Sequence, residues 1–519
     1  MTRSKLVRAV LVAALVAGCA AAVTVHASAA TTALEAESAT ISQGTVATNH
    51  PGFTGTGFVD YTNVAGSFVE FTVPASQAGT VTLAFRYANG TTANRTMDIG
   101  LNGTPIATGV PFAPTGSWST WRTQTVSATF AAGTNAVRAT ATTANGGPNL
   151  DSLTVSDSSG PPPTDWSTAV VDSTTQRKSP STLGGWGYTE GLYLYGQYLT
   201  YERTKNPKYL AYIKSWADRF VDSSGHITNS FNSLDSMQSG NVLLLLYKET
   251  KDTRYRSAAM QIRNRLKTYP RTADGGFWHA TSRQHQLWGD GVFMVLPFLV
   301  HYGAVVGEAS TLDNEAANQL LIYDQHLLAP NGLHFHAYDE SATQSWVVPG
   351  TNHSPEEWCR ATGWYAMALT EVLEYLPADH PQRQQLIAVD QRLIAGFKQY
   401  QDPATGRWFQ VIDKGNRSDD WTETSCSSMF TYTIARAVQR GYVDAATYQP
   451  VADKGYQGVL AKVSKGSDGL TNITDICVGT NVGDYAFYIA RTRATNDLHG
   501  LGSFLIMNEQ VQFGGDPNL

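Results

Sequence analysis

The stretch "GWYAMALTEVLEYL" at residues 363–376 decides the fold class of most of the chain. Its apolar residues recur at spacings of three and four, which predicts an amphipathic α-helix. The same spacing returns in "GLYLYGQYLTYERT" (191–204), "GNVLLLLYKET" (240–250), "AAMQIRNRLKTY" (258–269) and "SMFTYTIARAVQRG" (428–441). The chain beyond Trp166 is therefore predicted to be helical.

Glycine-centred loops recur between these segments, at Gly225, Gly276, Gly332, Gly406 and Gly469. They stand about 50 to 75 residues apart, a period that holds two helices and a loop. About 350 residues divided by this period gives about six helical hairpins, enough stacked pairs to bury a continuous core. We therefore expect an α/α toroid over residues 170–508, with the loops gathered at one end and a short tail at 509–519.

The same loops carry aromatic and polar side chains, among them Phe277, Trp278, His334, His336 and Trp408. Solvent-facing turns seldom need such bulk. Sugar rings have apolar faces that stack on aromatic rings, and hydroxyls that need hydrogen bonds. The loop end of the toroid is therefore predicted to bind carbohydrate.

The front of the chain has a different texture. Residues 31–157 are rich in Thr, Val, Ala and Gly and alternate in polarity, as in "SFVEFTV" (67–73) and "TVTLAFRYA" (80–88). Alternation between Gly and Asn turns predicts an antiparallel β-sandwich. The segment 158–169 follows as a linker, because its consecutive prolines favour an extended spacer.

The first 30 residues read as a secretory signal peptide. Arg3, Lys5 and Arg8 form a positive end, an apolar run follows, and "HASAA" (26–30) offers a small-residue cleavage site. A lipoprotein is the less favoured alternative, since "LVAGC" ends at Cys19 but the apolar run continues past it. No second apolar stretch reaches membrane-spanning length, so we expect a secreted, extracellular protein with no membrane partner.

Charge and cysteine content narrow the function classes further. The net charge is −6 with few basic clusters, which argues against nucleic acid as a partner. Beyond the signal peptide only Cys359, Cys426 and Cys477 remain. At most one bridge can form among them, the pairing stays open, and their spacing does not match a zinc site. We expect a monomer.

Asp290 is the residue with the strongest indication of chemistry. It lies within "HQLWGDGVFMVLPF" (285–298), where a carboxylate must edge a helix, pair with a cation or be kept protonated for use. Capping a helix is the ordinary alternative. Asp235 has the same relation to an apolar run in "SFNSLDSMQSGNVLLLLY" (230–247). Two such aspartates argue against a purely binding role, since binding alone does not need two acids in one cleft.

The segment "SPEEWCRATGWYAMAL" (354–369) adds Trp358, Arg360 and Trp364. An arginine can fork to a uronate carboxylate, tryptophans can form a platform for a sugar ring, and an aspartate can supply a proton. A structural cation–π contact is the alternative for Arg360. His334 and His336 alternate as on a strand, so we expect one of them to face solvent.

Several long motifs resemble glycoside hydrolase family 105, the unsaturated rhamnogalacturonyl hydrolases. They are "WHATSRQHQLWGDGVFMVLPF" (278–298), "SPEEWCRATGWYAMALTEVLEYLP" (354–377), "ETSCSSMFTYTIARAVQRGY" (423–442) and "VGTNVGDYAFYIARTRATNDLHGLGSFL" (478–505). The resemblance implies an (α/α)6 barrel. It also implies that Asp290 is the general acid/base, that Asp235 is the second aspartate of the cleft, and that the sugar subsite is lined by Trp278, His279, Trp288, His336, Trp358, Arg360 and Trp364.

The implied reaction explains the apolar setting of Asp290. A lyase leaves a C4=C5 double bond in a terminal uronic acid; an acid protonates C4, water adds at C5, and the hemiketal opens to release the next sugar. Such an acid needs a raised pKa, which an apolar pocket provides. Two departures from the family pattern bear on the substrate: Ala280 stands where members often carry lysine, and Gly289 where a bulkier residue is common.

The front domain resembles carbohydrate-binding module family 35 through "LEAESATISQG" (34–44), "GFTGTGFVDYTN" (52–63), "TGSWSTWRTQTVSATFAAGTNAVR" (115–138) and "NLDSLTV" (149–155). The resemblance implies a structural Ca²⁺ held by Glu35, Glu37 and Asp151, since hard carboxylate oxygens suit that ion. A polar strand edge is the alternative. Ligand contacts are expected from Trp118 or Trp121 and from Asn149.

Together these features predict a hydrolase that removes a Δ4,5-unsaturated uronic acid from lyase-generated oligosaccharides, most simply those of rhamnogalacturonan in pectin, with no cofactor for catalysis. The module would hold the enzyme on plant cell-wall or other acidic polysaccharide. Two alternatives stay open: the same chemistry on unsaturated glucuronyl oligosaccharides from glycosaminoglycan, arabinogalactan or ulvan, and a carbohydrate-binding protein without activity. A polysaccharide lyase would need a Tyr or Lys base.

Overall fold

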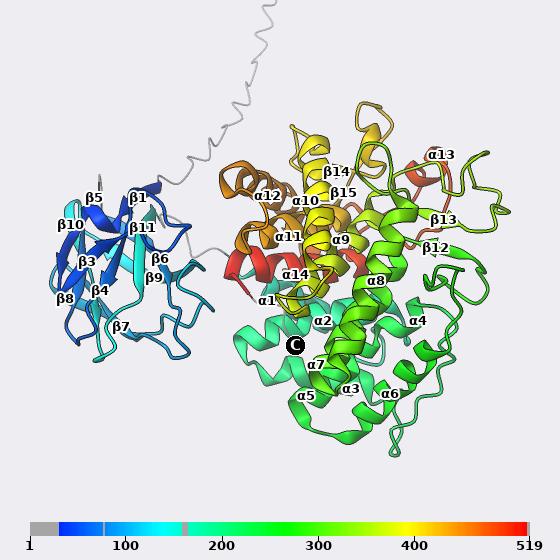
Figure 1. Cartoon of the computed structure of the whole chain (residues 1–519), viewed down its shortest axis with the longest axis horizontal. Coiled ribbons are helices and arrows are strands. Elements are labelled where there is room, and N and C mark those ends of the chain that lie inside the picture. Colours follow the sequence, from blue (N-terminus) through cyan, green and yellow to red (C-terminus); the bar gives the residue numbers. More distant parts are fainter. Residues whose placement is uncertain (1–30, 76–77, 158–163, 516–519) are drawn as a thin grey trace, which may run out of the picture. The chain divides into compact units, whose positions relative to one another are not determined.

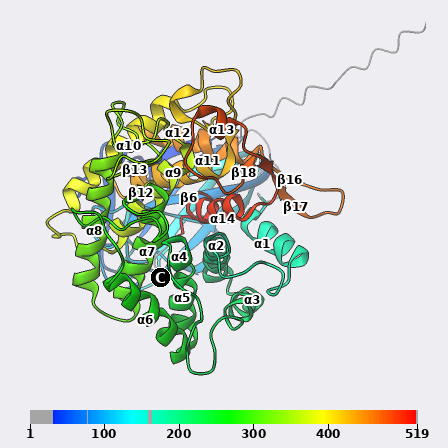
Figure 2. The same ribbon diagram turned by 90° about the vertical axis from the view of Figure 1, so that its right-hand side faces the viewer.

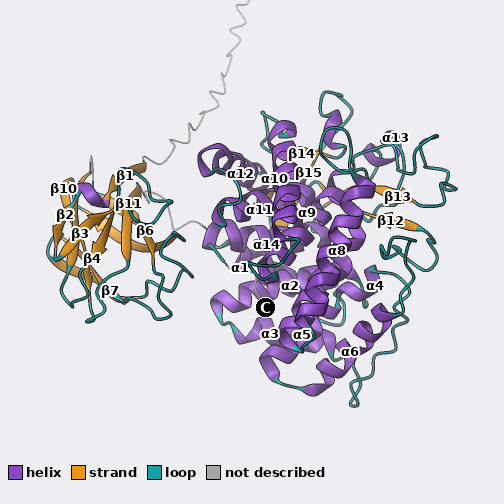
Figure 3. Cartoon of the chain, viewed as in Figure 1, coloured by secondary structure: helices purple, strands orange, loops and turns teal. Residues whose placement is uncertain are grey.

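The computed structural model describes residues 31–75, 78–157 and 164–515, which form two compact units divided after Thr164 (Figure 1). Strands make up the front unit and helices dominate the second one (Figure 3). The expected signal peptide, including Cys19, and most of the linker lie outside the described residues. Among the residues described, no helix combines the length and apolar character that a membrane crossing requires.

The front unit contains two antiparallel sheets that share one core. One sheet runs β3 (Gly44–Ala47), β4 (Phe58–Tyr61), β11 (Asn149–Asp157), β6 (Gly79–Ala88) and β9 (Arg122–Phe130), with β1 (Thr31–Glu35) also paired to β11. The other runs β2 (Thr40–Ser42), β5 (Phe68–Ala75), β10 (Gly133–Ala141), β7 (Met97–Leu101) and β8 (Thr104–Val110), and a 3-10 turn spans Ala36–Ser38. Alternate residues of β6, such as Leu83 and Phe85, are fully buried against Phe71 and Ile99 of the facing sheet, as a strand period of two requires.

In the described part of the second unit, six inner positions are held by α2 (Tyr188–Thr204), α4–α5 (Asp235–Gln238 and Gly240–Thr250), α7 (Asp290–Val305), α9 (Cys359–Tyr375), α11 (Thr424–Gln439) and α14 (Leu498–Phe513). Each of them packs on the next, and α14 packs back on α2, so the ring closes. The inner helices are buried on nearly every side, and their buried residues include the apolar runs of α5 and α7 as well as serines and threonines of α11.

Outer helices cover this ring, and Figure 2 shows α1, α3, α6 and α8 around its periphery. The outer helices are α1 (Trp166–Arg177), α3 (Pro207–Ala217), α6 (Thr253–Lys267), α8 (Ala309–Leu327), α10 (Arg383–Tyr400) and α12 (Ala445–Leu460). They alternate along the chain with the inner ones, as the hairpin period predicts. Helix α13 (Tyr485–Ile489) lies in the last long loop.

Two domain boundaries differ from the sequence expectation. The first helix begins at Trp166, where Asp165 accepts a hydrogen bond from the Thr168 amide at 2.9 Å, so the linker ends before residue 169. Helix α14 continues to Phe513 and ends at Gly514 in the left-handed conformation, so the helical domain extends past residue 508. Both ends are set by capping, which overrides an estimate based on apolar spacing.

The loops at the N-terminal ends of the inner helices are braced by short antiparallel ladders. They are β12 (Gln286–Trp288) with β13 (Ala337–Asp339), β14 (Trp408–Phe409) with β15 (Thr422–Glu423), β16 (Val463–Lys465) with β17 (Thr471–Ile473) and β18 (Ile476–Cys477) with β19 (Arg493–Ala494); a 3-10 turn spans Ile412–Lys414. A disulfide between Cys359 and Cys426 ties the starts of α9 and α11, and Cys477 is a buried free thiol. The structure thus shows which two of the three cysteines pair, a question that the sequence left open.

Candidate active site

Asp235 and Asp290 line the same pocket, together with Tyr188, Ser233, His279, Ala280, Ser282, Arg283, Trp288, Met294, Gly479, Thr480 and Asn481. Its volume is about 390 Å³. Asp235 begins α4 and Asp290 begins α7, and Tyr188 begins α2. The first residues of inner helices thus bring acidic and aromatic side chains together at one end of the ring, where the helix dipoles favour negative charge.

Asp290 is buried and held by His336. Its Oδ2 lies 3.1 Å from Nε2 of His336. Burial raises the pKa of Asp290, but the His336 hydrogen bond and the nearby charges of His336, His279 and Arg360 outweigh it and place the pKa below its ordinary value. The sequence expectation of a raised pKa for Asp290 is therefore wrong in direction: apolar neighbours were visible in the sequence, and the partner histidine was not assigned to this role.

Asp235 has the opposite shift. Burial raises its pKa above the ordinary value, and the negative charge of Asp290 adds to the rise, against a smaller opposing effect of His279 and Arg283. Nε2 of His279 lies 3.8 Å from Oδ2 of Asp235, and burial lowers the pKa of that histidine. A pair of acids whose environments push their pKa values apart is suited to acid–base work, with Asp235 holding a proton more readily than Asp290.

Further side chains around the aspartates were missed by the sequence analysis. Asp497, His499 and Tyr188 form a chain: Nδ1 of His499 is 2.6 Å from Asp497 Oδ1, and its Nε2 is 2.6 Å from the Tyr188 hydroxyl. Burial raises the pKa of Tyr188, so the phenol is neutral at ordinary pH. Tyr488 lies 2.6 Å from Nδ1 of His336. The contacts of Tyr188 with His499 and of Tyr488 with His336 join segments 311 and 152 residues apart, so no single segment indicates them.

The expected sugar platform is largely buried. Trp288, Trp358 and Trp364 are 3%, 1% and 1% exposed. Of these three only Trp288 lines the pocket, with the His279 ring stacked on it at 4.4 Å. Trp358 stacks on Tyr488, and Trp364 packs on Phe293. The expectation that Trp358 and Trp364 contact the sugar is corrected, since their apolar area serves the core instead.

Two other expected sugar contacts, and the expectation that one of two histidines faces solvent, differ from the structure. Trp278 packs on His285 and does not line the pocket. His336 is fully buried, so it acts on Asp290 rather than on a sugar. His334 is also fully buried and bound to Asp324, so neither histidine of this pair faces solvent.

Arg360 is not free to bind a substrate carboxylate. It is 1% exposed, and its two terminal nitrogens donate to the backbone carbonyls of Cys477 and Val478. The guanidinium also lies over the Trp358 ring at 4.8 Å. Arg360 thus makes the structural cation–π contact that was the alternative to binding a substrate carboxylate.

The two family departures have local explanations. A Cβ added at Gly289 would lie 3.2 Å from the Ala361 carbonyl oxygen, so a larger residue would require the start of α9 to shift by a few tenths of an ångström. Ala280 lines the pocket beside Arg283, whose amide donates to the Ala280 carbonyl at 2.9 Å. An arginine therefore stands in the same turn that has no lysine at position 280.

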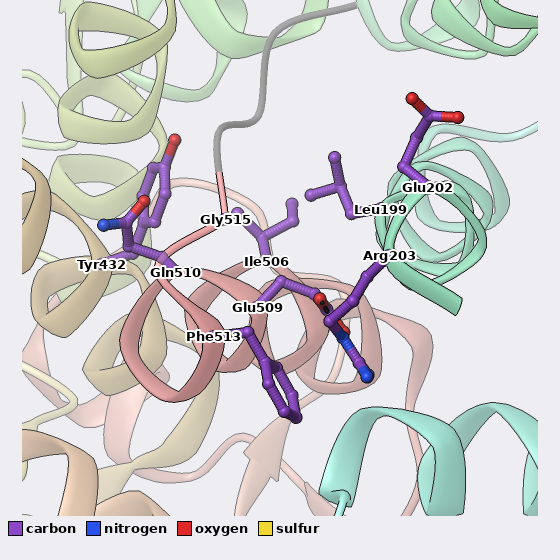
Figure 4. Close-up of a pocket in the computed structure, with 9 residues that line it drawn as sticks. All are labelled: Leu199, Glu202, Arg203, Tyr432, Ile506, Glu509, Gln510, Phe513 and Gly515. Carbon is purple, nitrogen blue, oxygen red and sulfur yellow. Dashed lines mark hydrogen bonds and ion pairs between the residues drawn. The ribbon is translucent and has the colours of Figure 1, made fainter. Parts of the chain in front are cut away.

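Another cavity, of about 240 Å³, lies beside the last turns of α2, where Leu199, Glu202 and Arg203 line it (Figure 4). It is formed by Leu199, Glu202, Arg203, Tyr432, Ile506, Glu509, Gln510, Phe513 and Gly515. Arg203 is bound to Glu509 and Asp165. Its charged groups are already paired, Arg203 with Glu509 and Glu202 with Lys205, so this cavity offers no acid–base pair and is not the candidate active site.

The expected calcium ligands of the module meet around one turn. Thr54 donates to Glu35 and Asp151, and Thr56 donates to Glu37. Oε2 of Glu37 is buried without a hydrogen-bond partner, which leaves a ligand oxygen free. Asp151, however, is paired with Arg86, and within the described residues these three carboxylates are not a set whose atoms all lie within 4.8 Å of one another. The residues therefore fit Ca²⁺ only in part: Glu37 has a free oxygen, but Asp151 is already paired.

The expected ligand residues of the module differ in accessibility. Trp118 is half-buried and packs over Gly90, with the Arg95 guanidinium 5.0 Å from its ring. Trp121 is also half-buried and donates to the Pro51 carbonyl. Asn149 is 3% exposed at the start of β11, so its contribution to a ligand surface is small.

Comparison with known proteins assigns the helical unit. The model for Glycosyl Hydrolase Family 88 matches residues 166–512, a range that includes both aspartates of the pocket. The chain belongs to glycosyl hydrolase family 88. The model for Carbohydrate binding module (family 6) matches residues 35–157, so the front unit is a carbohydrate-binding module; its expected place in family 35 stays a prediction.

Individual relatives of this family 88 chain agree. A solved glycoside hydrolase from family 105 of C. acetobutylicum is 32% identical, with a TM-score of 0.64 over 67% of this chain and 99% of that one. Unsaturated rhamnogalacturonyl hydrolase YesR of Bacillus subtilis is 26% identical over 50% of this chain and 73% of its own length. An exo-β-D-glucosaminidase of Amycolatopsis orientalis is 57% identical over 23% of this chain, but the chain spans only 12% of that protein.

Proposed function

We propose that this glycosidase removes a Δ4,5-unsaturated uronic acid from the non-reducing end of lyase-generated oligosaccharides, with rhamnogalacturonan fragments as its preferred source. The observation that carries the proposal is the pair Asp235 and Asp290 in one pocket with opposite pKa shifts. The likeness to a family 105 structure and to YesR supports the substrate class. The closed ring of paired helices supports an (α/α)6 barrel.

The reaction that these side chains suit is hydration of a vinyl ether. Protonated Asp235 donates its proton to C4, and the positive charge that develops at C5 and the ring oxygen is met by water. Asp290, ionised and held by His336, accepts the proton that the water loses as its oxygen bonds to C5. The resulting hemiketal opens and releases the neighbouring sugar, so one water is consumed in each turnover.

The proposal extends to the setting of the enzyme. Residues 1–30 direct secretion, and the front module binds plant cell-wall or other acidic polysaccharide and concentrates the enzyme there. Glu35 and Glu37 hold a structural Ca²⁺, to which the unpartnered Oε2 of Glu37 is suited. Catalysis itself uses the two aspartates and needs no cofactor.

The test measures the absorbance of the conjugated double bond at about 235 nm. The full mature chain and its Asp290→Asn variant are each incubated with lyase-digested rhamnogalacturonan. Loss of absorbance with wild type and not with the variant supports the proposal. Loss only on glycosaminoglycan or ulvan digests moves the substrate to unsaturated glucuronyl oligosaccharides. No loss on any digest leaves a carbohydrate-binding protein, and a rise on intact polymer indicates a lyase.

A further inference from the structure

A uronate substrate carries a carboxylate on the carbon that the water attacks, so a pocket that selects such substrates needs a cation facing it. This requirement rests on the proposed function. Arg360, the residue expected to meet it, is buried and committed to two backbone carbonyls. The pocket must therefore recruit its positive charge from another position.

Arg283 is the arginine that lines the pocket. Its guanidinium carbon lies 4.2 Å from the centre of the Trp288 ring, and Nη2 donates to Asn481 at 3.0 Å. The side chain is half-exposed. Across 31–75, 78–157 and 164–515, no carboxylate is ion-paired with it, and Asn481 is its one hydrogen-bonding side chain, so several of its five N–H donors remain available.

The neighbours of Arg283 hold it in place without neutralising it. The Trp288 face and the Asn481 amide orient the planar group by stacking and by one hydrogen bond. Burial lowers the pKa of Arg283, and the negative charge of Asp235 opposes that shift. Burial raises the pKa of Asp235, however, so this acid is more often neutral and competes weakly with an incoming carboxylate.

We propose that Arg283 is the residue that recognises the carboxylate of the unsaturated uronic acid, supplied by the "ATSRQ" turn (280–284) in place of a cation at position 280. Asn481, from the loop that follows β18, accepts a hydrogen bond from Nη2 of Arg283, and both residues line the pocket. Arg283 is thus a specificity-determining residue that binds substrate, whereas Arg360 is structural.

The experiment compares the unsaturated disaccharide as free acid with its uronate methyl ester, which keeps the ring and the double bond and removes the charge. Both are assayed with wild type, Arg283→Ala, Arg283→Lys and Arg265→Ala. Arg265 is a matched control, because it also lies over an aromatic ring, Tyr269, but outside the pocket. Thermal unfolding of each variant checks that the fold is kept.

Wild type and Arg265→Ala should prefer the acid over the ester in kcat/KM by about 10- to 100-fold, the size expected for a charge-assisted forked contact. Arg283→Ala should lose that preference, mainly because its KM for the acid rises. Its kcat/KM for the ester should change little. Arg283→Lys should keep part of it, because a lysine retains the charge without the fork.

The inference is overturned if Arg283→Ala is folded and still prefers the acid as wild type does. If wild type turns over neither compound, the proposed function fails by itself. The same two compounds are then titrated calorimetrically: a preference for the acid that disappears only in Arg283→Ala still supports a carboxylate site at Arg283, and equal binding of both compounds by wild type overturns it.

Discussion

Nε2 of His336 lies 3.1 Å from Oδ2 of Asp290, 46 residues away in sequence, and this contact lowers the pKa of Asp290. Nδ1 of the same ring meets the Tyr488 hydroxyl at 2.6 Å. His336 is fully buried and cannot turn to another partner. It therefore stabilises an ionised Asp290 in surroundings that would otherwise favour the protonated acid.

Removing His336 should change the pH dependence of the enzyme. In His336→Ala burial still raises the pKa of Asp290, but the hydrogen bond and charge that lower it are gone, so that pKa rises. Because Asp290 must be ionised to accept a proton from water, the acid limb of the kcat profile should move to higher pH, with kcat reduced more than KM is changed. His353→Ala, a half-buried histidine stacked on Phe335, is the control. An unshifted limb would contradict this role.

Removing either acid should abolish most turnover. Asp235→Asn and Asp290→Asn keep the shape of each side chain and should each lower kcat by about 10²- to 10⁴-fold, the usual contribution of general acid–base catalysis. Asp274→Asn, at a half-exposed pair with His326 outside the pocket, should stay near wild type. The rates are measured as the decrease with time in the absorbance of the double bond. A variant within tenfold of wild type would remove that aspartate from the mechanism.

Trp358 should prove to be a stability residue. It is 1% exposed, stacked on Tyr488 and in contact with the His336 ring, so Trp358→Ala should lower the free energy of unfolding by about 3–5 kcal/mol. Trp278→Ala, at a half-buried position, should cost less. Denaturant unfolding of the full chain measures both. A stable Trp358→Ala variant with a raised KM would instead restore its expected contact with the sugar.

Asp390 should make stability depend on pH. Burial within α10 raises its pKa from the ordinary 3.8 to about 8, and its Oδ1 has no hydrogen-bond partner. The folded state therefore holds a proton that the unfolded state releases, so the free energy of unfolding should fall between about pH 4 and pH 8, by at most about 1.4 kcal/mol per pH unit. Asp390→Asn should flatten this decline and unfold at higher temperature than wild type at pH 8. The same slope in both proteins would contradict the assignment.

Chelation tests the calcium proposal for the module. An ion bound only by the folded state raises its stability in proportion to ligand occupancy. EDTA should therefore lower the unfolding temperature of the front unit, and added Ca²⁺ should restore it. Glu37→Gln should unfold at the same temperature with and without EDTA, whereas Glu70→Gln, at an ion pair with Arg138, should respond like wild type. No response of wild type would mean that Arg86 already completes this cluster.

The sequence by itself determined the fold class of each domain, strands in the front unit and helices in the second. Apolar spacing of three and four located the helices, and strand alternation located the two antiparallel sheets, because both patterns follow from the local geometry of the backbone. It also singled out Asp235 and Asp290, since a carboxylate beside an apolar run is visible within one segment. Helix ends were less accurate, because Asp165 and Gly514 act through caps that spacing does not reveal.

Only the tertiary structure decided which side chains face the pocket. Arg360 and Trp358 look like substrate contacts in their own segment, but the strand Ile476–Cys477 and the loop that follows it, more than a hundred residues later, cover them and bond to the guanidinium. Arg283 is not distinguished within its own segment, and its proposed role depends on Asn481, which lies beside it only in the folded chain. The directions in which the pKa values of Asp235 and Asp290 shift also depend on the tertiary structure. Burial and electrostatic contacts depend on which distant segments the closed ring brings together, so a local pattern cannot encode them.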